Sequence, residues 1–247
     1  MPDVPDTGTP TRDTRAPDTD PGAAVVGYAR LTGLLGIVFA VLLTIGLVLI
    51  HRSPALDVSE SDYTVFYRDG GQTIVVTVGL YLVPFAGIAF LWHLTTVRLL
   101  VRALTPAPSV IPFALQAVAG ALFVGLLFAG TAAAGAVALL QDLNDGPLPD
   151  VNVGRALAGV GYAMVFVYAT RMAGMYAITT TTLLLHAGLL PRWVALLSYL
   201  MATVMLVATT FNPAVVLVFP GWVALTGLIV LMRTGRSGAP MTPRSRP

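Results

Sequence analysis

Cysteine is absent from the 247-residue chain. Its absence excludes disulfide bonds, thiolate metal sites, cysteine nucleophiles and covalently attached c-type haem. Lysine is absent as well, so all fourteen basic residues are arginines. Charged residues of both signs make up only 11% of the chain, which is far less than a soluble protein carries on its surface.

The sequence also lacks the motifs of several enzyme classes. It contains no HExxH and no GxSxG, and no paired carboxylates lie within its apolar segments. The sequence therefore shows no group of residues that is typical of a hydrolase active site. It contains no P-loop and no GxGxxG, and no folded basic surface is available for nucleic acid. We expect a protein that is not an enzyme and that holds no metal or cofactor. A haem held between His93 and His186 is the weaker alternative, because single histidines near a membrane surface more often hydrogen-bond to backbone or water.

Long apolar segments dominate what is present. Hydrophobic residues make up 56% of the chain, and the mean hydropathy is +0.81. These values indicate an integral membrane protein, because a helix needs roughly 20 apolar residues to cross a bilayer. The sequence predicts an all-α membrane protein with a six-helix transmembrane bundle inside residues 27–233. The expected helices cover about 31–50, 73–97, 110–140, 156–186, 193–211 and 214–232.

The segments outside the predicted helices are polar. Residues 1–26 are rich in Pro, Asp and Thr and are expected to be disordered, as is the basic tail 234–247. The first helix follows an acidic stretch and lacks a cleavage site of small residues, so we expect it to be retained and not removed as a signal. The loop between the first two helices carries Tyr63, Phe66 and Tyr67, which can lie on a short interfacial helix.

The distribution of arginine predicts the orientation. Cytoplasmic loops of membrane proteins carry an excess of basic residues. With both termini cytoplasmic, ten arginines lie inside, three outside and one within the membrane. We therefore expect a multi-pass protein of the cell (plasma) membrane with both termini in the cytoplasm. The ten inner arginines are Arg12, Arg15, Arg30, Arg98, Arg102, Arg192, Arg233, Arg236, Arg244 and Arg246.

Arg171 is the arginine within the membrane. It lies about 24 Å along a continuous helix from Arg155 at 1.5 Å per residue, which is close to the bilayer midplane. An arginine at this depth costs about 2.5 to 3.5 kcal/mol on insertion scales, and no acidic residue lies in the six segments to offset that cost. Its partners are then backbone carbonyls, neighbouring hydroxyl or amide groups, a loop carboxylate such as Asp69 or Asp142, or a bound anion. The candidate polar site, structural or ligand-binding, comprises Arg171, Gln116, Tyr168, Thr179 and Thr182.

Small residues and prolines predict how the helices pack. Gly130 and Ala134 stand four residues apart and favour a close helix contact, within the chain rather than in a dimer. Pro84 and Pro220 lie inside the second and sixth helices, where each removes a backbone hydrogen bond and tends to kink the helix. Pro213 is suited to begin the last helix after a tight turn.

Two stretches, "RMAGMYAITTTTLLLHAGLLPRWVALLSYLMATVMLV" and "VVLVFPGWVALTGLIVL", carry a resemblance. The chain resembles a family of uncharacterised actinobacterial integral membrane proteins with six predicted helices. The family's arginine in the fourth helix, its Ser- or Thr-rich turn and its "LPRW" junction match Arg171, Thr179 to Thr182, and Leu190 to Trp193. The resemblance implies the six-helix fold but no activity.

Two functions follow as expectations. The first is a non-enzymatic accessory, regulatory or scaffold component of the membrane, because polar residues are sparse and catalytic groups are not visible. The alternative is a small transporter or a lipid- or anion-binding protein that acts through Arg171. The expected partners are membrane lipids and, in addition, a second copy of the chain or an unidentified membrane protein, but no nucleic acid.

Overall fold

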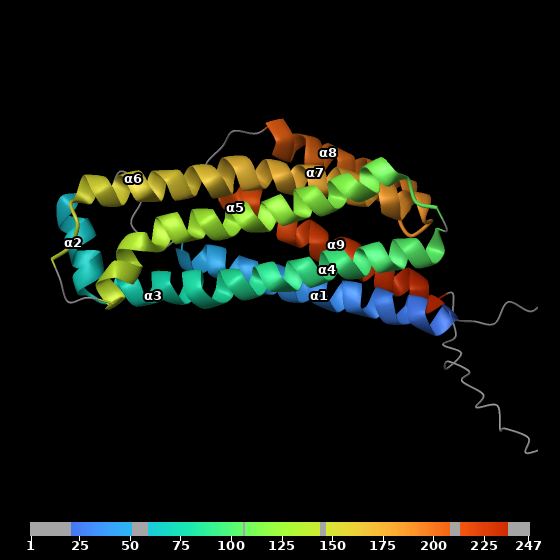
Figure 1. The fold of residues 1–247 in the computed structure, drawn as a ribbon, viewed down its shortest axis with the longest axis horizontal. Helices are drawn as coiled ribbons and strands as arrows, with labels where there is room; N and C mark the ends of the chain where they lie inside the picture. Colours follow the sequence, from blue (N-terminus) through green and yellow to red (C-terminus); the bar gives the residue numbers. More distant parts are fainter. Residues whose placement is uncertain (1–20, 51–58, 106, 144–146, 208–212, 237–247) are drawn as a thin grey trace, which may run out of the picture.

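The computed structural model describes residues 21–50, 59–105, 107–143, 147–207 and 213–236. Every regular element in these residues is helical, which confirms the all-α class. The long helices run side by side along one axis, as Figure 1 shows. The predicted disordered tails lie mostly outside these ranges. Their described parts, 21–26 and 234–236, are helical.

The first two long helices are longer than the sequence predicts. Helix α1 spans Pro21–Ile50 and begins ten residues before the expected start at residue 31. The residues ahead of Leu31 are mostly alanine, valine and glycine, so they extend the apolar helix in spite of Arg30. A second run consists of α3 (Gly71–Thr77), a π-helical segment η1 (Val78–Leu82) and α4 (Val83–Leu104).

The other helices agree with the expected order. Helix α5 spans Val110–Leu143. A third composite run follows, made of α6 (Val151–Tyr162), a π-helical segment η2 (Ala163–Ala169) and α7 (Thr170–His186). Helices α8 (Arg192–Val207) and α9 (Pro213–Arg236) complete the bundle, and α9 begins at Pro213 as predicted. Tyr63, Phe66 and Tyr67 lie on a short helix α2 (Glu60–Arg68), which confirms the expected helix, while its position at the membrane interface stays a prediction.

Five of these helices are long and apolar enough to cross a membrane. The chain is therefore a multi-pass membrane protein by the length and composition of its helices. Helix α8 is apolar but shorter, at 16 residues, so a count of six spans stays a prediction. The start of α1 and the end of α9 lie at the same end of the bundle in Figure 1.

The helices pack through a continuous aromatic core. Helix α1 packs between α4 and α9, and α7 packs between α5 and α8. Gly33 of α1 lies against Gly227 of α9, and Gly36 lies against Val223, so α1 and α9 are antiparallel. The aromatic core joins α1, α4, α5, α7 and α9 through Phe39, Phe90, Phe123, Tyr176 and Phe219.

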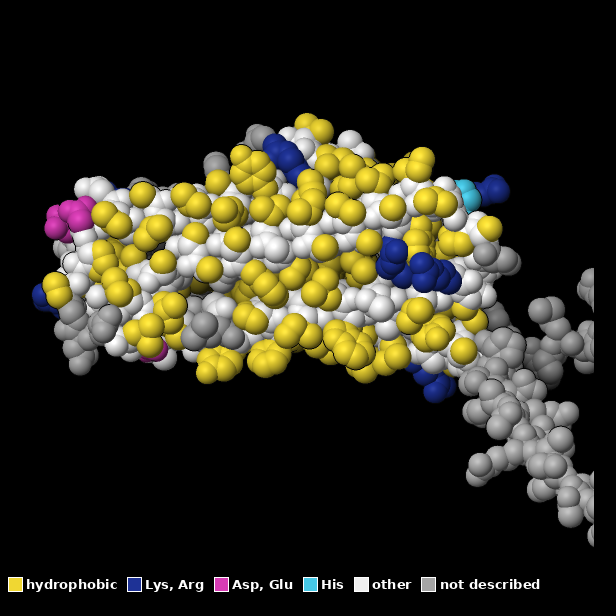
Figure 2. All heavy atoms as spheres, in the orientation of Figure 1, with side chains coloured by type: hydrophobic (Ala, Val, Ile, Leu, Met, Phe, Trp, Pro, Cys, Tyr) yellow, Lys and Arg dark blue, Asp and Glu magenta, His cyan; other side chains and the backbone are white. Residues whose placement is uncertain are grey.

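Charge is divided between the two ends of the bundle. Among the described residues, every acidic side chain lies on α2, at the end of α5 or at the start of α6 and in the turns beside them. Figure 2 shows acidic side chains at that end and arginines gathered mainly toward the other. The arginines at the opposite end include Arg30, Arg98, Arg102, Arg192 and Arg233.

Candidate functional site

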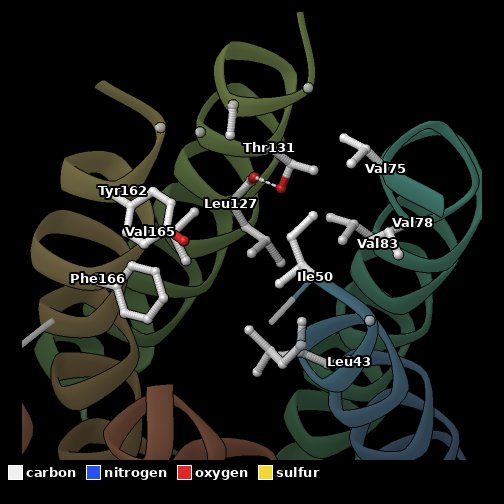
Figure 3. Close-up of a pocket in the computed structure, with 16 residues that line it drawn as sticks. Leu43, Ile50, Val75, Val78, Val83, Leu127, Thr131, Tyr162, Val165 and Phe166 are labelled. Carbon is white, nitrogen blue, oxygen red and sulfur yellow. Dashed lines mark hydrogen bonds between the residues drawn. The ribbon is translucent and has the colours of Figure 1, made fainter. Parts of the chain in front are cut away.

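An apolar pocket opens in the half of the bundle that carries the acidic end. About 630 Å³ of space free of protein atoms lies at this pocket, and this volume includes space open to the exterior. The pocket lies between the end of α1, the α3–η1 run, α5 and η2, and the labelled side chains of Figure 3 converge on it from these four sides. We call it the outer pocket. Leu43, Ile50, Val78, Leu127 and Phe166 contribute much of its wall.

The wall of the outer pocket is almost wholly hydrocarbon. Among the described residues that line it, only Thr131 and Tyr162 have polar side-chain atoms. The Thr131 hydroxyl donates to the Leu127 carbonyl at 2.7 Å, so it is already satisfied within α5. The Tyr162 ring stacks on Phe166 with centroids 5.1 Å apart. Such a wall binds an apolar group by contact and offers almost no hydrogen bonds to a polar one.

Both π-helical segments border this pocket, η1 through Val78 and η2 through Val165 and Phe166. The first has a local cause, because Pro84 has no N–H to donate to the preceding turn and the backbone N–H of Val83 bonds instead to Val78, five residues back. The predicted disturbance at Pro84 therefore takes the form of a π-helical turn. Such turns occur frequently at functional sites.

Small residues let the helices around the pocket approach one another. A Cβ added at Gly161 of α6 would lie 2.5 Å from the Gly130 carbonyl oxygen and 2.8 Å from the Ala134 nitrogen of α5. This confirms that Gly130 and Ala134 form an intramolecular helix contact. Gly135, one residue further along, lies on the pocket wall instead, where a Cβ would meet Val75 at an ordinary 3.7 Å.

A second cavity lies on the other side of the contact between α3 and α5. About 670 Å³ of space free of protein atoms lies there, including space open to the exterior, and it is bordered by Val76, Gly79, Pro84 and Phe128. It shares four wall residues with the outer pocket: Val75, Val83, Thr131 and Gly135. The packing of these four residues therefore decides whether the two cavities stay separate.

Arg171 lies just after η2, at the start of α7. It is half-buried, and its Nη1 donates to the Val167 carbonyl of the π-helical segment at 3.0 Å. The hydroxyl of the preceding Thr170 donates to Val165, five residues back, at 3.1 Å. Arg171 and Thr170 thus both donate hydrogen bonds to backbone carbonyls of η2. Backbone carbonyls are one of the kinds of partner that the sequence analysis considers for Arg171.

The other residues of the predicted polar site do not meet Arg171. The fully buried Gln116 donates through Nε2 to Thr180 at 2.9 Å. Because Thr180 stands nine residues after Arg171, this bond lies about 13 Å further along α7. Thr179 bonds to carbonyls of its own helix, Thr182 meets the Tyr199 hydroxyl at 2.9 Å, and Tyr168 is 57% exposed. A single site built from all five residues stays a prediction.

The two histidines lie at different depths. His93 is buried, and its Nδ1 lies 2.9 Å from the Thr32 carbonyl. Its neighbour Leu94 and Tyr176 both pack against Gly120, which places His93 close to the level of Tyr176. His186 stands ten residues, or about 15 Å, further along α7, and its Nδ1 lies 2.7 Å from the Thr182 carbonyl. This arrangement does not favour a haem held between them.

Sequence reasoning missed the outer pocket. The signals for it were the small residues of α5 and α6 together with Pro84, but their convergence depends on the register between helices that are far apart in the chain. Comparison with protein-family models, with curated proteins and with solved structures gives no match. The six-helix actinobacterial family therefore stays a prediction from the resemblance, and what the findings support is a multi-helix protein of the membrane type.

Proposed function

We propose that this chain is a non-enzymatic component of the cell membrane that binds the hydrocarbon chain of a lipid in the outer pocket. The observation that carries the proposal is the composition of the pocket wall: among its described lining residues, Thr131 and Tyr162 are the only ones with polar side chains, and the Thr131 hydroxyl is already bonded. An acyl or isoprenoid chain matches such a wall, and the bilayer around the bundle supplies acyl chains. Binding a lipid in this way suits an accessory or regulatory role.

The proposed orientation places both termini in the cytoplasm and the outer pocket in the opposite half of the membrane. The start of α1 and the end of α9 lie at the same end of the bundle in Figure 1, which supports an even number of crossings. The arginines gathered at that end support its cytoplasmic side. The proposed partners are lipids, with a second copy of the chain or another membrane protein as further candidates and no nucleic acid.

Filling the outer pocket is expected to abolish chain binding. In Gly135→Leu the new side chain enters the pocket, and its Cβ meets only Val75 at 3.7 Å, so the backbone need not move. The purified full chain in mild detergent would be titrated with 11-(dansylamino)undecanoic acid, whose fluorescence rises in an apolar site. We expect at least a tenfold loss of affinity.

The matched control is Gly125→Leu on the same helix, where an added Cβ meets nothing within 4 Å. This variant should bind the probe as the parent does. Equal affinities in the parent and both variants would place the probe elsewhere and contradict the proposal.

A second candidate, an anion-binding or carrier protein that acts through Arg171, is favoured by one observation. A guanidinium has five N–H donors, and a single hydrogen bond to Val167 uses only one of them in the described part of the chain. The remaining N–H groups of the Arg171 guanidinium could therefore donate hydrogen bonds to an anion bound near the bilayer midplane.

The variant Arg171→Gln separates the two functions. It loses one hydrogen bond, worth about 1 kcal/mol, and avoids the cost of a buried charge, so under the favoured proposal it folds with nearly parental stability. Native mass spectrometry of parent and variant, released from nanodiscs, should then show the same adducts. An adduct of defined mass that vanishes in Arg171→Gln and persists in Arg171→Lys would move anion binding to first place.

A further inference from the structure

Two arginines share one aromatic ring at the basic end of the bundle. The Arg98 guanidinium carbon lies 3.7 Å from the centroid of the Phe113 ring, and that of Arg102 lies 4.7 Å from the same centroid. Arg98 also donates through Nη1 to the Phe113 carbonyl, so it is held in place from two directions. Arg98 is half-buried and Arg102 is exposed.

Nothing negative in the described residues faces this pair. The described carboxylates lie at the other end of the bundle, and neither arginine forms an ion pair within the described ranges. The two arginines stand four residues apart on α4, where like charges repel each other. An anion between the two guanidinium groups would relieve that repulsion.

The start of α5 adds a third positive element beside the ring. Helix α5 begins at Val110, three residues before Phe113, and runs for 34 residues. The first amide groups of a helix lack acceptors within it, and its N-terminus carries a partial positive charge. The two cations and this helix end therefore converge on one place.

Apolar side chains surround these charges and face outward. Val110 is 79% exposed and Ile111 is 71% exposed, while Leu99 and Leu104 are exposed on α4. A free inorganic ion gains nothing from contact with these apolar side chains. A lipid, in contrast, can place its phosphate between the arginines and its hydrocarbon chains along the apolar side chains. Figure 2 shows adjacent basic side chains set among hydrophobic ones on this part of α4 and α5.

We propose that Arg98 and Arg102, held on Phe113, form a binding site for the phosphate of an anionic membrane lipid. The guanidinium groups supply paired donors to the phosphate oxygens, which is the geometry that arginine offers and lysine does not. Phe113 holds both groups in position and shields them from water on one face. The site lies at the opposite end of the bundle from the outer pocket and does not depend on the function proposed for that pocket.

The test measures lipid binding by the full chain in nanodiscs of phosphatidylcholine. Phosphatidylglycerol would be added in steps, and bound lipid would be counted by native mass spectrometry. Each basic residue near an anionic surface contributes about 1 kcal/mol, which is about a fivefold change in affinity. We therefore expect Arg102→Gln to weaken phosphatidylglycerol binding about fivefold. The double variant Arg98→Gln/Arg102→Gln should weaken it by at least tenfold. Binding by the parent should also weaken as salt is raised.

Arg192→Gln is the matched control, because it removes an exposed arginine from the same end of the bundle. It should leave binding within twofold of the parent. Arg102 is exposed, and the interaction that the structure shows for its guanidinium is with the Phe113 ring, so Arg102→Gln remains informative if the double variant fails to fold.

Three results would overturn the proposal. In the first, Arg192→Gln weakens binding as much as Arg102→Gln does, which would indicate general attraction of charge. In the second, both Arg102→Gln and the double variant bind as the parent does. In the third, inorganic phosphate displaces phosphatidylglycerol at equal concentration, which would show an anion site without a role for the lipid.

Discussion

Gly161→Ala is expected to destabilise the protein by about 3 kcal/mol, at the upper end of the usual cost of overpacking, because the new methyl group meets backbone atoms and not flexible side-chain ends. Its Cβ would lie 2.5 Å from the Gly130 carbonyl oxygen and 2.8 Å from the Ala134 nitrogen. Relief requires α5 and α6 to separate, which would also open the outer pocket. Thermal unfolding in detergent, followed by size-exclusion chromatography after heating, measures the loss as a lower midpoint temperature.

Gly159→Ala is the control for this prediction. It lies two residues away on α6, and an added Cβ there meets nothing within 4 Å. Alanine favours helix over glycine by up to about 1 kcal/mol, so Gly159→Ala should be neutral or stabilising. Equal unfolding temperatures for Gly161→Ala and Gly159→Ala would contradict the close approach of α5 and α6 at Gly161.

Phe90→Ala is the second substitution with a large expected effect. Phe90 is fully buried, and its ring lies within 6.3 Å, centroid to centroid, of the rings of Phe39, His93, Phe123, Tyr176 and Phe219. Removing a buried phenylalanine costs about 3–5 kcal/mol through lost contacts and the cavity that remains. In a bilayer the contacts matter most, because helix association depends on packing rather than on exclusion of water.

The measured midpoint should fall by roughly 10 °C, given about 2–4 °C per kcal/mol for a protein of this size. Phe85→Ala on the same helix gives the comparison, since Phe85 is 56% exposed. That variant should unfold within a degree or two of the parent. A small effect of Phe90→Ala would mean that the aromatic residues do not hold the helices together.

The sequence predicted the helices better than the sites. Long apolar runs specify helices whatever lies beside them, and Pro213 marked the start of α9 through the intrinsic preference of proline. The contact at Gly130 and Ala134 was also predictable, because four-residue spacing places both on one face of a helix. The start of α1 at Pro21 was missed, since the expectation assigned residues 1–26 to a disordered tail and began the first helix at residue 31, after Arg30.

The sites depend on register between distant segments, and a single sequence does not contain that information. Arg171 illustrates the difference. Its expected depth came from counting residues. Its bond to Val167 arises where a π-helical segment changes the local hydrogen bonding, and η2 contains no proline that would predict such a segment. The pairing of Arg98 and Arg102 on Phe113 likewise needed the angle between α4 and α5.

The length of α5 has a consequence for how the protein opens. Its 34 residues extend about 51 Å at 1.5 Å per residue, while the hydrocarbon core is about 30 Å thick. Even a tilt of 40°, at the limit of what membrane helices adopt, leaves roughly 10 Å beyond the core. The end near Asp142 meets α2 and α6 through a small cluster of Tyr63, Val137 and Val151. That cap has few buried contacts and lies next to water, so its amide hydrogens should exchange with solvent by sub-global unfolding while the rest of the bundle stays closed.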